Sequence, residues 1–217
     1  MKKLIIAISS VLMLLATSAN SLELRPSIGI SGNMGVYAAT GIEENFNEAG
    51  TNIDETTKEY GAFTTEYGSI LLELGLTDVI SIGVDYVPST IETPRNTSND
   101  GPNPNSVEAH FEDLTTLYAK INVPLGGTYL KVGYSQVDVI SKEIMNSGST
   151  YGNDSTQGMT VGIGYNHEIT GGVSIRAELT GSEFEDVKAS NNATNKTNIS
   201  VQDMIGARGT ISIVKSF

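Results

Sequence analysis

Few side chains in this 217-residue sequence could carry out catalysis. The chain has two histidines, His110 and His167, and no cysteine. A serine hydrolase would need a serine and a histidine on neighbouring segments, with an acid behind the histidine. No segment presents that arrangement, and no nucleophile clusters near either histidine in the sequence. We therefore predict that the protein is not an enzyme and that both histidines are loop or rim residues.

A second candidate for chemistry is the acidic stretch 41–61, GIEENFNEAGTNIDETTKEYG. Its carboxylates belong to Glu43, Glu44, Glu48, Asp54, Glu55 and Glu59. Calcium favours several carboxylates, so calcium binding is the functional alternative here, but the spacing of an EF-hand loop is absent. We expect a solvated acidic loop instead. The sequence indicates no metal site and no cofactor.

Seven other charged residues lie in segments where apolar residues alternate with small or polar ones. They all fall on the polar face of their segments: Glu73, Asp85, Lys120, Lys131, Arg176, Glu178 and Arg208. Alternation with a period of two is typical of strands with two different faces. Four bases and three acids can neutralise one another inside a narrow lumen, where an isolated charge would be costly. We expect them to form a charge network that plugs the lower half of such a lumen.

The alternating segments also predict the architecture that would hold this network. Eight of them lie at about residues 24–40, 62–76, 80–86, 111–123, 130–135, 159–166, 173–180 and 205–217. Short turns at 77–78, 124–127 and 170–172 alternate with long polar connectors at 41–61, 93–108, 143–157 and 189–198. A meander with this pattern has its short turns and both termini at one end. Because the strand count is even, the first and last strands can pair and remove the exposed edges.

The composition of the two faces indicates which of them points outwards. One face is almost purely apolar, and in the fourth segment it includes both Phe111 and Leu117. The other face is mostly Gly, Ser, Thr and Asn, with the seven charges. A membrane barrel has apolar residues outside and polar residues inside, and a soluble barrel has the reverse. We therefore predict an all-β fold, an eight-stranded antiparallel up-and-down transmembrane β-barrel, in preference to a secreted soluble barrel.

The first residues, MKKLIIAISSVLMLLATSANS, have the layout of a secretory signal peptide. Lys2 and Lys3 precede an apolar run over 4–16, which is too short for a membrane-spanning helix of about 20 residues. We predict a cleavable signal peptide at 1–21, cut after Ala19 or Ser21, and a barrel domain at 22–217. The chain is acidic, with 25 Asp and Glu against 13 Lys and Arg, so no nucleic-acid partner is expected.

The mature chain resembles the small eight-stranded bacterial outer-membrane barrels, the OmpA/OmpX-like and opacity-protein-like surface proteins. The segments LYAKINVPLGGTYLKVGYSQ and GMTVGIGYNHEITGGVSIRAEL are similar to the hairpins of that family. The resemblance implies a monomer in the lipid of the bacterial outer membrane. It also implies that Phe217 belongs to the signal read by the outer-membrane assembly machinery. Lys215 departs from the family pattern, and the chain has no tryptophan for an aromatic girdle.

This resemblance, together with the lack of catalytic residues, predicts a non-enzymatic outer-membrane surface protein. The barrel would be the structural anchor, and four extracellular loops would contact a ligand in adhesion or recognition. A narrow channel or carrier for small solutes is the alternative, although an eight-stranded lumen is just wide enough for side chains to fill. A barrel lipase or lipid-A-modifying enzyme is the third hypothesis.

Overall fold

The computed structural model describes residues 24–47, 50–98, 105–144, 150–191 and 197–217. The predicted signal peptide lies outside these residues. Eleven strands are present in them: β1 (Arg25–Phe46), β2 (Ile53–Gly75), β3 (Ile80–Tyr86), β4 (Ile91–Glu92), β5 (Asn96–Ser98), β6 (Asn105–Asn122), β7 (Thr128–Ile144), β8 (Asp154–Thr170), β9 (Val173–Phe184), β10 (Val187–Ser190) and β11 (Thr197–Ser216). None of the described residues belongs to a helix long and apolar enough to cross a membrane.

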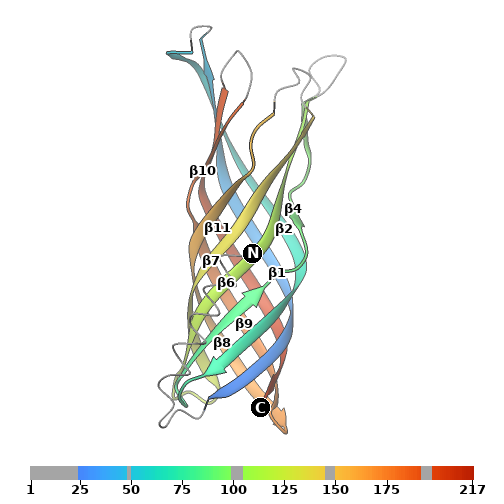
Figure 1. The fold of residues 1–217 in the computed structure, drawn as a ribbon, viewed down its shortest axis with the longest axis vertical. Helices are drawn as coiled ribbons and strands as arrows, with labels where there is room; N and C mark the ends of the chain where they lie inside the picture. Colours follow the sequence, from blue (N-terminus) through green and yellow to red (C-terminus); the bar gives the residue numbers. More distant parts are fainter. Residues whose placement is uncertain (1–23, 48–49, 99–104, 145–149, 192–196) are drawn as a thin grey trace.

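The long strands form one closed antiparallel ring, seen as a tall barrel in Figure 1. Their order is β1-β2-β3-β6-β7-β8-β9-β11, and β11 pairs with β1 to close it. The closing register runs from Ser27 opposite Ser216 to Asn45 opposite Thr197. The predicted fold class and the pairing of the first and last strands are confirmed. Strand β11 therefore runs almost to the C-terminus because β1 and β9 hold it on both sides.

The short turns gather at one end of the barrel, the turn end, as predicted. Two of them rest on consecutive glycines with positive φ, Gly126 (57°) with Gly127 (94°) and Gly171 (57°) with Gly172 (79°). That conformation is open to glycine at little cost, which explains why the turns LGG and TGG can be so tight. The opposite end, here called the distal end, carries the long connections.

The predicted long loops are wrong for much of their length. Strand β1 continues to Phe46 and β2 begins at Ile53, so most of the stretch 41–61 is a paired two-stranded ribbon. Strand β6 begins at Asn105 and β8 at Asp154, inside two other predicted loops. Both faces of these distal extensions contain polar residues, so the sequence alternation that marks a buried face disappears there. Backbone pairing continues without that pattern because it does not depend on side-chain polarity.

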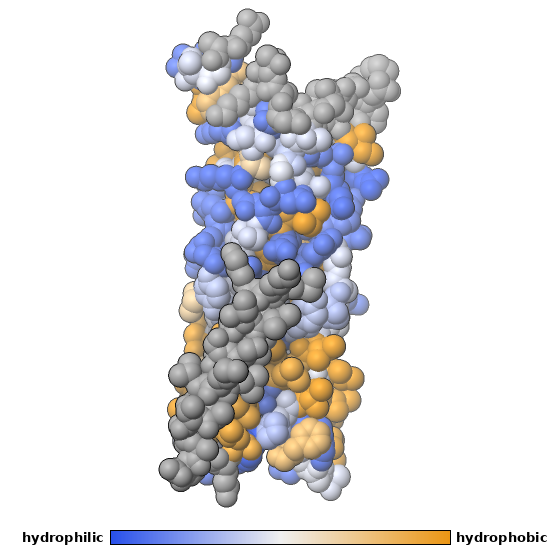
Figure 2. All heavy atoms as spheres, viewed as in Figure 1, coloured by the Kyte–Doolittle hydropathy of each residue, from blue (hydrophilic) through white to orange (hydrophobic). Residues whose placement is uncertain are grey.

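An apolar belt surrounds the barrel in its half nearest the turn end, visible in orange in the lower part of Figure 2. It consists of outward-facing side chains such as Ile30 (63% exposed), Leu72 (52%), Val161 (59%), Leu179 (67%) and Ile211 (59%). Above it the described surface is mainly hydrophilic. Exposing so many large apolar side chains to water would be unfavourable, whereas lipid accommodates them. The belt therefore marks the membrane-spanning zone.

Two β-bulges change which residues face the lumen near the upper edge of this belt. One lies on β6, between the pairs formed by Glu112 and Thr115, where Asp113 has a φ of 55°. The other lies between β1 and β11, where Asp203 has a φ of 53°. An extra residue in a strand reverses the inside-outside order of everything beyond it. Consequently Phe111 lines a distal cavity while Leu117 faces outwards, and the prediction that they share the outer face is wrong.

The C-terminal residue completes the seam between β11 and β1. The backbone N–H of Phe217 donates to the carbonyl oxygen of Pro26 at 3.0 Å, and the residue as a whole is 73% exposed. The neighbouring Lys215 directs its ammonium group to the carbonyl oxygen of Gly171 at 2.5 Å. It also lies 5.5 Å from the centroid of the Phe217 ring. Lys215, the residue at which the sequence departs from the family pattern, thus links β11 to the turn at 170–172.

We propose that Phe217 acts in assembly more than in the stability of the finished barrel. Its deletion removes one backbone hydrogen bond, worth about 1 kcal/mol, and an exposed ring. We expect fewer heat-modifiable, membrane-inserted molecules in cells but an unchanged denaturation midpoint for the refolded barrel. Phe217→Tyr, which keeps an aromatic terminus, should insert normally. Unchanged insertion kinetics in the deletion variant would remove this role.

Candidate functional site

The structure places all seven charged residues from the polar faces inside the barrel. Six of them are at most 8% exposed: Glu73, Asp85, Lys120, Lys131, Arg176 and Arg208. The side chain of the seventh, Glu178, is 9% exposed. Several are sequence neighbours of belt residues, as Glu73 is of Leu72 and Lys131 of Leu130. The charges therefore lie at the height of the membrane, shielded from lipid by the barrel wall.

Glu73 is the centre of this charge network. The guanidinium of Arg176 donates two hydrogen bonds to its carboxylate, Nη1 to Oε2 at 2.8 Å and Nη2 to Oε1 at 3.0 Å. Lys120 Nζ donates to Oε1 at 2.5 Å, and the Tyr118 hydroxyl donates to Oε2 at 3.2 Å. Arg176 and Glu73 come from β9 and β2, 103 residues apart in the chain. The paired geometry is the strong bidentate form of an arginine–carboxylate contact.

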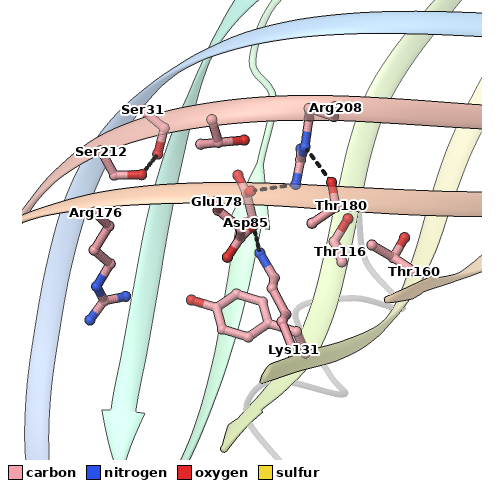
Figure 3. Close-up of polar contacts among 12 residues, drawn as sticks. Ser31, Asp85, Thr116, Lys131, Thr160, Arg176, Glu178, Thr180, Arg208 and Ser212 are labelled. Atoms are coloured by element: carbon pink, nitrogen blue, oxygen red, sulfur yellow. Dashed lines mark hydrogen bonds and ion pairs between the residues drawn. The ribbon is translucent and has the colours of Figure 1, made fainter. Parts of the chain in front are cut away.

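Two further ion pairs complete the network (Figure 3). Lys131 Nζ donates to Glu178 Oε1 at 2.9 Å, and the Tyr129 hydroxyl donates to Oε2 of the same carboxylate at 3.0 Å. Arg208 Nη2 donates to Asp85 Oδ2 at 3.3 Å. The second oxygen of Asp85, Oδ1, is buried and has no hydrogen-bond partner among the described residues. Every charge is paired, but the Asp85–Arg208 contact is the loosest.

Tyrosine rings fill the space between these charges. A gap between these side chains, lined by Glu73, Tyr118 and Tyr129 among others, measures about 10 Å³, which is at the lower limit for one water molecule. Lys131 Nζ lies 4.2 Å from the centroid of the Tyr118 ring, a cation–π contact. Each ring covers a glycine on another strand, Tyr118 over Gly83 and Tyr129 over Gly164. The lumen is therefore closed at the membrane level in this structure.

A chain of hydrogen-bonded hydroxyl groups runs along the inner face of the barrel, from strand to strand, beside the charges. Thr116 Oγ1 lies 2.8 Å from Ser135 Oγ, which lies 2.9 Å from Thr160 Oγ1. Thr160 in turn lies 2.8 Å from Ser182 Oγ. These residues come from β6, β7, β8 and β9. These four residues satisfy one another as donors and acceptors, so they need no water partner.

A cavity of about 390 Å³ lies on the distal side of the network. Its walls are mostly apolar and include the nearly parallel rings of Phe63 and Phe111, with centroids 6.2 Å apart. Tyr37 stacks on Phe63 at 5.6 Å, and Val137 is 5% exposed. The size falls in the range of small-molecule sites, which are typically apolar and about 300–1,000 Å³. The barrel thus has a polar interior at the membrane and an apolar interior above it.

Sequence reasoning missed some of the residues that form these two regions. Tyr118 and Tyr129 could have been found from alternation, because each lies two residues from a lumen lysine in the same strand. The cavity could not, because its lining on β6 depends on the bulge at Asp113. Both histidines lie in strands, His110 in β6 and His167 in β8. Neither is a loop residue, but His167, which is exposed and three residues from the end of β8, is a rim residue as predicted. The carboxylates described in the acidic stretch 41–61 form no metal-binding group with one another.

No family model and no curated protein matches this sequence. The fold is similar to the outer membrane protein OprG from Pseudomonas aeruginosa, with a TM-score of 0.60 and 13% identity over 88% of this chain and 95% of that chain. A looser match is the outer membrane protease OmpT from Escherichia coli, with a TM-score of 0.46 and 9% identity over 88% of this chain and 97% of that chain. Another is Ail, the attachment invasion locus protein of Yersinia pestis, with a TM-score of 0.40 and 10% identity over 87% of this chain and 99% of that chain.

The ring of strands, the outward apolar belt and the paired lumen charges define an eight-stranded transmembrane β-barrel. The similarity to OprG confirms that this is the fold of bacterial outer-membrane barrels, as the resemblance of the sequence implied. The outer membrane is accordingly the location of the protein. At this level of identity the comparison concerns the fold alone, so the residues themselves must support any more specific function.

Proposed function

We propose that this barrel is a non-enzymatic, monomeric surface protein of the outer membrane, with a closed lumen and an extracellular recognition surface. The observation that carries the proposal is the continuation of paired strands well beyond the apolar belt. The β1–β2 ribbon pairs as far as Phe46 and Ile53, so its outer part is an ordered surface. A paired ribbon can present fixed side chains to a partner at a smaller entropic cost than a flexible loop.

The outer ribbon is acidic on both of its strands. Its charged residues described in the structure are Glu43, Glu44, Asp54, Glu55, Lys58 and Glu59, and several of them are exposed. An acidic surface attracts a partner with basic residues and raises its association rate at low ionic strength. The partner that fits this surface is therefore a basic segment of an extracellular protein.

Three measurements test this proposal. Protease added to intact cells should cut the chain only in 41–61, 93–108, 143–157 or 189–198, because these regions would lie outside the cell. A binding screen with the purified barrel should find partners that are lost when the ribbon 42–58 is replaced by an Asn-Gly turn, which joins the paired residues Gly41 and Glu59. Cutting confined to the turns at 77–78, 124–127 or 170–172 would reverse the topology. Reproducible ion steps in planar bilayers would contradict the closed lumen.

The apolar cavity supports a second candidate function, the binding and carriage of a small apolar molecule. Such a ligand would reach the cavity from the distal side, because the charge network closes the lumen towards the turn end. The stacked rings of Phe63 and Phe111 offer flat apolar surfaces for a hydrocarbon chain or an aromatic ring. Carriage across the membrane would then require the network to open or the ligand to leave through the wall.

Filling the cavity should abolish this binding. In lipid nanodiscs, adding decane should shift the methyl NMR signal of Met204, which lines the cavity. Val137→Phe places a ring in the cavity and should remove the shift. Val132→Phe is the matched control, because Val132 lies on the same strand but is 41% exposed in the belt. If decane does not shift the Met204 methyl signal of the wild type, the candidate function is contradicted.

A further inference from the structure

Three potential metal ligands gather on the barrel wall beside the apolar cavity. Glu92 on β4 pairs directly with His110 on β6, and Glu108 lies two residues before His110 on the same face. One ligand atom from each lies within 4.8 Å of the others. This is the one such group among the described residues. The cluster arises from strand pairing, which brings residues 16–18 positions apart in sequence onto one patch.

The cluster faces away from the cavity. Ile91 and Phe111, which form the adjacent pair of the β4–β6 ladder, line the cavity. Successive side chains of a strand point to opposite faces, so Glu92 and His110 point to the outer surface. Both lie beyond the bulge at Asp113, on the distal side of the apolar belt. The site is therefore reachable from water outside the membrane.

The three ligands already converge on one point. His110 Nε2 and Glu108 Oε1 are joined by a hydrogen bond, and the second oxygen of Glu108 accepts from Arg95 Nε at 2.9 Å. The side chains of His110 and Glu108 are only 17% and 12% exposed.

We propose that Glu92, Glu108 and His110 form a binding site for one divalent transition-metal ion of the Zn²⁺ type. The imidazole nitrogen favours such an ion over Mg²⁺ or Ca²⁺, which prefer oxygen ligands. Two carboxylates balance its double charge. With Zn–ligand distances of about 2.0–2.1 Å, tetrahedral ligands stand roughly 3.4 Å apart. The ion would replace the proton between His110 and Glu108, so small side-chain rotations would have to move these two ligand atoms apart and bring Glu92 into line with them.

Metal binding at this position would stabilise a part of the barrel wall that has little backbone pairing. Strand β4 has only two residues, Ile91 and Glu92, and no described strand pairs with it other than β6. Glu92 would hold the ion on the outside while Ile91 closes the cavity on the inside. An ion bound there would therefore order the cavity wall.

The test uses refolded, tag-free protein in detergent micelles, stripped of metal with a chelator, and titrated with Zn²⁺ by calorimetry. We expect saturation at one ion per chain and a change in the NMR signals of the His110 ring. Glu92→Gln and His110→Asn should each weaken binding about tenfold or more, since even indirect supports of metal ligands have effects of that size. His167→Asn is the matched control, because it removes the other histidine, which is exposed near the turn end.

Heat-modifiable migration in gels will show that each variant is folded, so that lost binding cannot be attributed to misfolding. The proposal is overturned if the wild type shows no saturable Zn²⁺ binding. It is also overturned if His110→Asn binds as the wild type does, or if His167→Asn loses the site. Equal affinity for Ca²⁺ and Zn²⁺ would likewise contradict an imidazole-containing site.

Discussion

Replacing Glu73 by alanine should lower the free energy of unfolding of the barrel by about 3–5 kcal/mol, the cost of leaving a buried charge without its partner. The substitution removes the shared acceptor of Arg176 and Lys120. Both cations would remain in a lumen where they are 6% exposed. Unfolding in denaturant, followed by heat-modifiable migration, measures the loss.

A surface variant provides the comparison for this effect. Lys58→Ala on the outer ribbon removes an exposed charge, and exposed pairs are worth about 0–1 kcal/mol. The losses of unfolding free energy in Arg176→Ala and Glu178→Ala should be closer to the loss in Glu73→Ala than to that in Lys58→Ala, because each substitution leaves a lumen partner unpaired. The lumen variants should also leak ions in planar bilayers if the charge network is what closes the barrel. If all of them match the wild type in stability and conductance, the lumen is hydrated and the network is not a plug.

Gly164→Val should disrupt the other half of the network through packing. A Cβ at Gly164 would lie 2.2 Å from the Tyr129 ring, and Tyr129 is only 2% exposed. The ring would have to move, which would break its hydrogen bond to Glu178. Overpacking of this kind costs about 1–3 kcal/mol. The denaturation midpoint should fall, and the fluorescence of the tyrosines should report the displaced ring.

Gly32→Val is the matched control for that experiment. A Cβ at Gly32 would meet nothing within 4 Å, and the residue faces outwards on β1. Valine suits a strand and an apolar environment, so this variant should be as stable as the wild type or more stable. A Gly164→Val barrel as stable as Gly32→Val would show that Tyr129 is not held by the network.

Much of the fold can be predicted from the sequence because the barrel repeats one simple rule. Within the belt, every strand alternates between lipid and lumen, so the period of two is visible in each segment. The short turns and the even number of strands then imply the order of the ring and its closure by β11. The inward position of Glu73 and Arg176 follows from the same alternation, without any knowledge of their partners.

The tertiary structure decided the features for which alternation carries no information. The pairing of Glu73 with Arg176 depends on the curvature of a ring that brings β2 and β9 face to face across the lumen. Phe111 lines the cavity only because one extra residue at Asp113 reverses the faces of β6. Glu92 meets His110 only through the register of β4 on β6. Sequence patterns report the local environment of each residue, whereas contacts across the ring and the position of a bulge depend on how all the strands close together.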